Sequence, residues 1–312
     1  MTRVGVVDLG TNSTRLLVAD VEDGEVREVD RRLEITRLGE AVDSRRQLLP
    51  EAIARVRNVL GDYRRIIEEH GAERTLAFAT SAVRDAENGE AFLGEIEWSY
   101  GFETRLLTGH EEALLTFRGV STGREIEEDT LVLDVGGGST ELIVGGSSGV
   151  SFHESYDLGC VRLTERFPGD PEGCAAYVRT TLSQNVPAEE RPRLAIGVAG
   201  TVTQLATLDL GLEREEPELV HGHRLRARAI EQLLGKLAAM PVDHIRDLRG
   251  MHPDRAPVIV AGTVVVLETL RRFGLDELEV SERDIMHGAA LAAAALPAPF
   301  EGDAPPGAYT CC

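Results

Sequence analysis

The chain lacks an apolar run long enough to cross a membrane. Residues 289–296 are the longest candidate, far short of the roughly 18 apolar residues that a spanning helix needs. The first residues also lack the basic, apolar and small-residue regions of a secretory signal. We therefore expect a cytoplasmic location and no membrane partner.

Cysteine is scarce, with four residues in 312. Cys160, Cys174, Cys311 and Cys312 show neither a CxxC pair nor zinc-finger spacing, which indicates reduced thiols rather than disulfides or a zinc site. Cys311 and Cys312 end a segment rich in proline and glycine, residues 298–312, which we expect to be disordered.

Positive charge is scarce as well. The 33 Lys and Arg residues face 53 Asp and Glu residues, which gives a formal net charge of -20. Such a chain repels nucleic acid and anionic surfaces. We therefore expect no nucleic-acid partner.

What the chain does contain is an alternation of short β-rich runs with helical periods, which is typical of α/β architecture. Residues 4–7, 16–21 and 74–79 predict strands, and a helix is predicted from Pro50 to just before Gly71. A chain of this length with 42% hydrophobic residues can bury two cores.

An internal repeat indicates where two domains divide. VVDLGTNST at residues 6–14 aligns with VLDVGGGST at residues 132–140, an offset of 126. The identical pairs are Val6 and Val132, Asp8 and Asp134, Gly10 and Gly136, Ser13 and Ser139, Thr14 and Thr140, Leu16 and Leu142, and Val18 and Val144. A smaller echo, VAGTV at 198 and 260, predicts two strand–turn–helix units whose glycines serve either ligand contact or helix packing. We expect domains at residues 1–125 and 126–297.

The glycine loops suggest phosphate chemistry. Successive glycines can direct several N–H groups into one concavity, and Ser139 and Thr140 add hydroxyl donors. Asp134 and Glu141 flank the second loop and offer oxygen ligands to a hard divalent cation. An anion together with such a cation suggests phosphate with magnesium. The alternative is a glycine-rich β-hairpin with solvated acids.

The order of the motifs DLGTNS, TSAVRDA, GHEEA, DVGGGSTE, GCVRLTERF and GVAGTVT resembles the Ppx/GppA family of exopolyphosphatases and guanosine pentaphosphatases. The resemblance spans residues 4–290, and the length is similar to the short, two-domain actinobacterial type. It implies two actin-like, ribonuclease-H-like α/β domains of the sugar kinase, Hsp70 and actin superfamily, with a cleft between them that closes on phosphates.

The same resemblance implies roles for individual residues. Glu112 is the expected general base that takes a proton from the attacking water, whereas for Glu111 we keep the alternative that it only favours the helix start through the macrodipole. Asp134 and Glu141 are expected to hold Mg2+ or Mn2+, and Asp8 to order metal-bound water. The expected phosphate-binding residues are Thr11, Asn12, Ser13, Ser81, Arg84, Gly136, Gly137, Gly138, Ser139, Thr140, Gly200 and Thr201. The alternative for Arg84 is a surface ion pair with Asp85 or a nearby glutamate.

Other reactive residues carry less information. His221 and His223 have no acidic or cysteine partner at metal-ligand spacing and favour a surface turn. Cys160 favours a packed thiol, because hydrolysis by water needs no thiol nucleophile. The sequence leaves open whether Arg162 faces the expected cleft.

These observations predict a magnesium-dependent exopolyphosphatase that removes terminal orthophosphate from inorganic polyphosphate. The alternatives are a guanosine pentaphosphate (pppGpp) phosphohydrolase, an ATP-using phosphotransferase and a non-catalytic protein that binds alarmone nucleotides. The resemblance also implies a homodimer.

Overall fold

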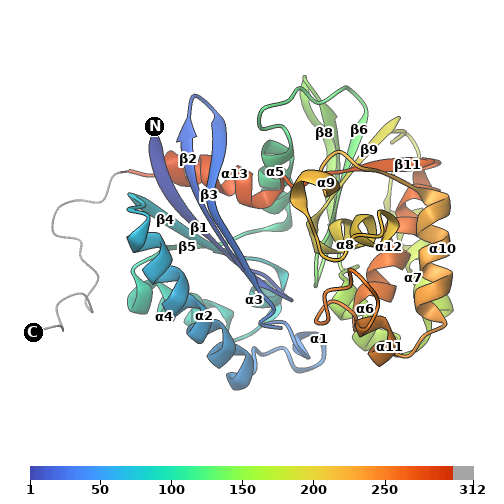
Figure 1. Ribbon diagram of the computed structural model, residues 1–312, viewed down its shortest axis with the longest axis horizontal. Helices are drawn as coiled ribbons and strands as arrows, with labels where there is room; N and C mark the ends of the chain where they lie inside the picture. The colour runs from blue at the N-terminus through green and yellow to red at the C-terminus, as the bar shows by residue number, and fades with distance from the viewer. Residues whose placement is uncertain (298–312) are drawn as a thin grey trace, which may run out of the picture. The chain divides into compact units, whose positions relative to one another are not determined.

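The computed structural model describes residues 1–297, which form two compact units (Figure 1). Unit 1 contains Met1–Arg124 and the described residues from Ile285 onward, and unit 2 contains Glu125–Asp284. Among residues 1–297, no helix is both long enough and apolar enough to span a membrane.

Unit 1 is built on a five-stranded sheet with the order β3-β2-β1-β4-β5. The first three strands pair antiparallel, and β4 and β5 continue the sheet in parallel from β1. The strands are β1 (Thr2–Leu9), β2 (Thr14–Glu22), β3 (Glu25–Glu34), β4 (Arg74–Ala79) and β5 (Glu103–Leu106). The three strands predicted from the sequence are confirmed, whereas β3 was not predicted.

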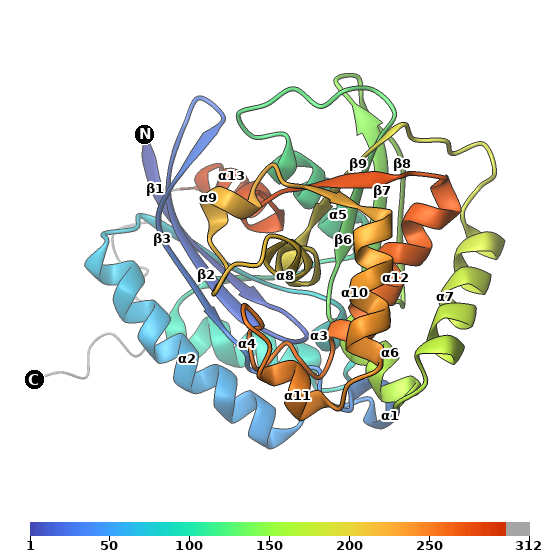
Figure 2. The ribbon, with the colours of Figure 1, turned by 45° about the vertical axis from the view of Figure 1, so that its right-hand side comes forward.

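Helices cover both faces of this sheet (Figure 2). They are α1 (Val42–Arg45), α2 (Pro50–Glu69), α3 (Ser81–Asp85), α4 (Gly89–Tyr100), α5 (Gly109–Val120) and α13 (Ile285–Ala294). Helix α2 begins at the predicted proline. Its buried apolar stripe includes Val56, Leu60, Tyr63 and Ile67. With α4 it covers one face, and α13 covers the other.

Unit 2 repeats this plan with a six-stranded sheet of order β10-β11-β9-β6-β7-β8. Its strands are β6 (Thr130–Val135), β7 (Thr140–Gly146), β8 (Gly149–Tyr156), β9 (Leu194–Val198), β10 (Arg224–Arg226) and β11 (Glu277–Val280). Strands β8, β7, β6, β9 and β11 have the order and directions of the five strands of unit 1, and β10 is added at the edge. The predicted pair of ribonuclease-H-like α/β domains is therefore confirmed.

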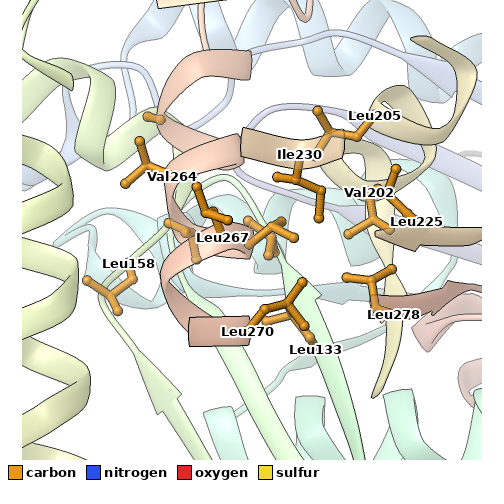
Figure 3. Close-up of a cluster of buried hydrophobic side chains, with 14 of the residues drawn as sticks. Leu133, Leu158, Val202, Leu205, Leu225, Ile230, Val264, Leu267, Leu270 and Leu278 are labelled. Carbon is orange, nitrogen blue, oxygen red and sulfur yellow. The ribbon is translucent and has the colours of Figure 1, made fainter. Parts of the chain in front are cut away.

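The helices of unit 2 are α6 (Cys160–Arg166), α7 (Pro171–Asn185), α8 (Ala199–Asp209), α9 (Pro217–Val220), α10 (Ala227–Ala238), α11 (Val242–Arg246) and α12 (Ile259–Phe273). Their apolar faces meet the sheet in one core. Figure 3 shows side chains from strands and helices meeting there, including Leu133, Val202, Ile230, Val264 and Leu278.

Two expectations differ from the structure. The second VAGTV stretch does not follow a strand but lies inside α12, because the whole apolar run after Pro257 is buried as one helix. The second domain does not extend to residue 297, since α13 packs in unit 1 against Val4, Val6 and Leu76. Gly288 allows this, because a Cβ there would lie 1.9 Å from the carbonyl oxygen of Leu115 on α5. Residues 298–312, predicted to be disordered, lie outside the described part of the chain.

Candidate phosphate and metal site

The first glycine loop joins β1 to β2 through a tight turn. The N–H of Gly10 donates to the carbonyl oxygen of Ser13 at 3.0 Å, and a Cβ on Gly10 would lie 2.9 Å from that oxygen. Within residues 1–297, nothing accepts a hydrogen bond from the backbone N–H groups of Thr11, Asn12 and Ser13. Three successive donors are therefore available to an anion.

The first loop is held in place by two other segments. The hydroxyl of Thr11 lies 3.0 Å from that of Ser81 at the start of α3, and both side chains are buried. The N–H groups of Arg37 and Gly39 donate to the carbonyl oxygens of Asn12 and Thr11 at 2.9 and 2.8 Å. A Cβ on Gly39 would lie 2.3 Å from Cγ2 of Thr11. No motif in the sequence pointed to this support by residues 37–39.

The second loop, between β6 and β7, has the same turn. The N–H of Gly136 donates to the carbonyl oxygen of Ser139 at 3.0 Å. The N–H groups of Gly137, Gly138 and Ser139 find no acceptor in the described part of the chain. Thr140 differs from expectation, because its hydroxyl is buried and donates to the carbonyl oxygen of Leu158 at 3.0 Å. The two loops therefore share a hydrogen-bonding pattern as well as a sequence. In each loop, three successive N–H groups have no acceptor among the described residues.

The two hairpins differ in charge at equivalent positions. In unit 1, Asp8 lies opposite Arg15 in the ladder, and the Arg15 guanidinium is 2.7 Å from Oδ2 of Asp8. In unit 2, the corresponding residues Asp134 and Glu141 are both acids, lie directly opposite each other and are both buried. Glu141 also accepts a hydrogen bond from Ser155 at 2.8 Å. Comparing the repeats at their offset of 126 could have revealed Arg15 as the counterpart of Glu141.

The predicted base lies beside the predicted arginine. Glu112 is in the first turn of α5 and is 5% exposed. Nη1 of Arg84 donates to Oε1 of Glu112 at 2.5 Å and to the carbonyl oxygen of Leu107 at 2.6 Å. Glu111 points elsewhere and closes a capping box with Thr108, whose backbone N–H lowers the pKa of the Glu111 carboxyl. Glu111 therefore caps the start of α5. Arg84 forms an ion pair with the buried Glu112 instead of a surface pair, and its expected contact with phosphate stays a prediction.

Gly200 and Thr201 lie where β9 turns into α8. A Cβ on Gly200 would lie 3.1 Å from the guanidinium of Arg255, and Thr201 contacts both the Cys160 thiol and Gly262. These are contacts with protein groups, and the phosphate-binding roles expected for Gly200 and Thr201 stay predictions. Sequence reasoning did not identify Arg255, whose guanidinium pairs with Glu215 at 2.5 Å.

The remaining reactive groups are engaged in structural contacts. Burial raises the pKa of the Cys160 thiol to about 11, which fits a packed thiol. His221 accepts a hydrogen bond from the backbone of Glu282, and His223 lies 2.8 Å from Asp209. Among residues 1–297, no group of three or more His, Cys, Asp or Glu side chains could hold a metal ion. The acids Asp134 and Glu141 form only a pair.

Within each unit, the structure brings most of the expected residues together. In unit 1, a chain of contacts runs from the first loop through the Thr11–Ser81 hydroxyl pair and helix α3 to Arg84 and Glu112. In unit 2, the acid pair flanks the second loop, and Cys160 links Gly136 to Thr201. The sequence did not single out the support of this loop by the start of α6.

Comparison with known proteins places the chain in a family. The model of the Ppx/GppA phosphatase family matches residues 17–295. Exopolyphosphatase 2 of Mycobacterium tuberculosis is 39% identical over 318 residues, which cover 94% of this chain and 99% of that protein.

Solved structures agree with this placement. The crystal structure of an exopolyphosphatase-like protein has a TM-score of 0.86 and 32% identity, covering 93% of this chain and 98% of that one. A Ppx/GppA family member from Aquifex aeolicus has a TM-score of 0.77 and 29% identity, covering 93% and 97%. The chain therefore belongs to the Ppx/GppA phosphatase family and is a hydrolase of phosphoanhydride bonds.

Proposed function

We propose that this hydrolase is an exopolyphosphatase, which releases terminal orthophosphate from inorganic polyphosphate. The observation that carries the proposal is the repeated glycine turn, in which three successive N–H groups of each unit remain uncommitted. Such arrays of amides bind phosphoryl oxygens closely, without a side chain in the way. The name of the M. tuberculosis relative supports polyphosphate as the substrate.

The acid pair beside the second loop fits a divalent cation. Like charges directly opposite each other in an antiparallel ladder repel, and a hard cation with oxygen ligands relieves that repulsion. Asp134 and Glu141 would hold Mg2+ or Mn2+, which when bound neutralises phosphate oxygens. In unit 1, Arg15 already supplies a positive charge to Asp8. Asp8 therefore stays in the proposal as a residue that orders water, not as a direct ligand.

Glu112 and Arg84 would work together on the attacking water. Arg84 uses Nη1 for Glu112 and Leu107, and no described residue accepts a hydrogen bond from its Nε or Nη2. A guanidinium has donors on three nitrogens, so Arg84 can hold the carboxylate and still bind a phosphate oxygen. Glu112, fixed in this way, takes the proton of the water as that water attacks phosphorus.

Phosphate release from polyphosphate, pppGpp and ATP, measured in parallel with and without chelator, tests the proposal. An exopolyphosphatase releases orthophosphate from polyphosphate fastest, and chelation stops it reversibly. Faster release of orthophosphate from pppGpp would identify pppGpp as the substrate instead of polyphosphate. ADP formation that depends on an acceptor would indicate a phosphotransferase, and nucleotide binding without turnover would indicate a non-catalytic binder.

A further inference from the structure

The start of α6 packs against the second glycine loop, and its N–H groups bind the carbonyl oxygens of that loop. The N–H groups of Cys160 and Val161 donate to the carbonyl oxygens of Gly136 and Gly137 at 2.9 and 2.8 Å. Gly159 allows this approach, because a Cβ there would lie 2.2 Å from the oxygen of Gly137. The first turn of α6 thereby finds acceptors, and the loop carbonyls find donors.

Arg162 completes the arrangement with its side chain. Nε of Arg162 donates to the carbonyl oxygen of Gly138 at 2.8 Å, and its backbone N–H to that of Gly137 at 3.2 Å. The guanidinium also lies 3.6 Å from Asp157, and the side chain is only 10% exposed. A charged guanidinium donates a stronger hydrogen bond to a carbonyl oxygen than a neutral N–H group does.

These contacts determine where the loop amides point. In a planar trans peptide the C=O of one residue and the N–H of the next point in opposite directions. The carbonyls of residues 136–138 point toward the start of α6, so the N–H groups of Gly137, Gly138 and Ser139 point away from it. These are the three amides that no described residue binds.

We propose that Arg162 is a positioning residue, which fixes the second glycine loop with its amides directed at phosphate without touching the substrate itself. The inference rests on the proposed binding of phosphate by this loop. The first loop has a related arrangement, in which the backbone N–H groups of Gly39 and Arg37 donate to the carbonyl oxygens of Thr11 and Asn12 from a different segment. Asp134 and Glu141 lie on β6 and β7, where the strand pairing holds them independently of the loop. Loss of Arg162 should therefore lower the affinity for phosphate far more than the affinity for the metal ion.

Arg162→Ala tests the proposal, because it should weaken the binding of phosphate and leave the binding of the metal ion nearly unchanged. Inhibition by the product, inorganic phosphate, should weaken about tenfold, and KM for polyphosphate should rise similarly, because a charged hydrogen bond no longer fixes the loop. The metal concentration for half-maximal rate should change little. Added guanidinium ion should restore part of the phosphate affinity, which a general loss of stability would not permit.

Arg166→Ala is the matched control, since Arg166 lies on the same short helix but is exposed and contacts Tyr177 at 2.8 Å. Its inhibition by inorganic phosphate and its KM for polyphosphate should equal those of the wild type. If Arg162→Ala does not fold, Arg162→Lys replaces it and should show a smaller loss of phosphate affinity. Phosphate affinity equal to wild type, or equal losses of phosphate and metal affinity, would overturn the positioning role. Absence of hydrolysis in the wild type would instead refute the proposed function.

Discussion

Replacing Glu112 by glutamine tests the proposed base most directly. Glutamine keeps the shape of the side chain but cannot accept a proton at neutral pH. A positioned general base contributes about 10²–10⁴-fold to rate, so kcat should fall by that factor, equivalent to about 3–5 kcal/mol of transition-state stabilisation. KM and inhibition by orthophosphate should change much less, because both glycine loops remain intact.

The structure indicates that this variant will fold. The amide oxygen of the new side chain can still accept from Nη1 of Arg84, so the 2.5 Å contact becomes a hydrogen bond without the ion pair. Because the carboxylate is buried, losing its charge next to Arg84 should lower the free energy of unfolding by about 1–2 kcal/mol. Thermal melting of the variant separates this effect from the effect on rate.

The assay is initial-rate orthophosphate release at saturating polyphosphate and metal. Glu111→Gln is the control, because Glu111 only caps the helix through Thr108 and its variant should retain turnover near wild type. A kcat for Glu112→Gln within a few-fold of wild type would remove Glu112 from the mechanism. Equal losses in both glutamine variants would point to the start of α5 as a structural element rather than to a base.

Three further expectations follow from other parts of the fold. Glu141→Ala should raise the metal concentration for half-maximal rate by at least about tenfold, and an unchanged metal titration would leave that acid a structural role. Gly159→Ala should lower stability by about 1–3 kcal/mol and raise KM, because its Cβ meets loop backbone, whereas Gly235→Ala, with open space around it, should be neutral or stabilising in melting experiments. Arg3 lowers the pKa of the buried Asp20 carboxyl, so this pair stabilises the fold above the ordinary pKa of about 4 and loses that effect as pH falls through the lowered value. Asp20→Asn should therefore flatten the pH dependence of the melting temperature at acid pH, and a slope equal to wild type would contradict this.

The sequence predicted the two hairpins and their glycine turns because both depend on residues that are neighbours along the chain. In both hairpins the glycine after the strand closes the turn with the same bond, from Gly10 to Ser13 and from Gly136 to Ser139, and a Cβ on either glycine would crowd the serine carbonyl oxygen. The apolar period of α2 and its opening proline likewise depend on neighbours along the chain. Strand β3 escaped prediction because it lies at the sheet edge and carries mostly charged residues.

The tertiary structure alone decided which residues far apart in sequence meet. Helix α13 returns to unit 1, Arg84 takes Glu112 as its partner, and Arg162 caps the loop at Gly138. None of these contacts leaves a period or spacing in the sequence, because each depends on how strands and helices pack rather than on the residues between them. The sequence therefore determined the local form of the two hairpins, and the packing around them decided which charged groups hold the loops and the predicted base in place.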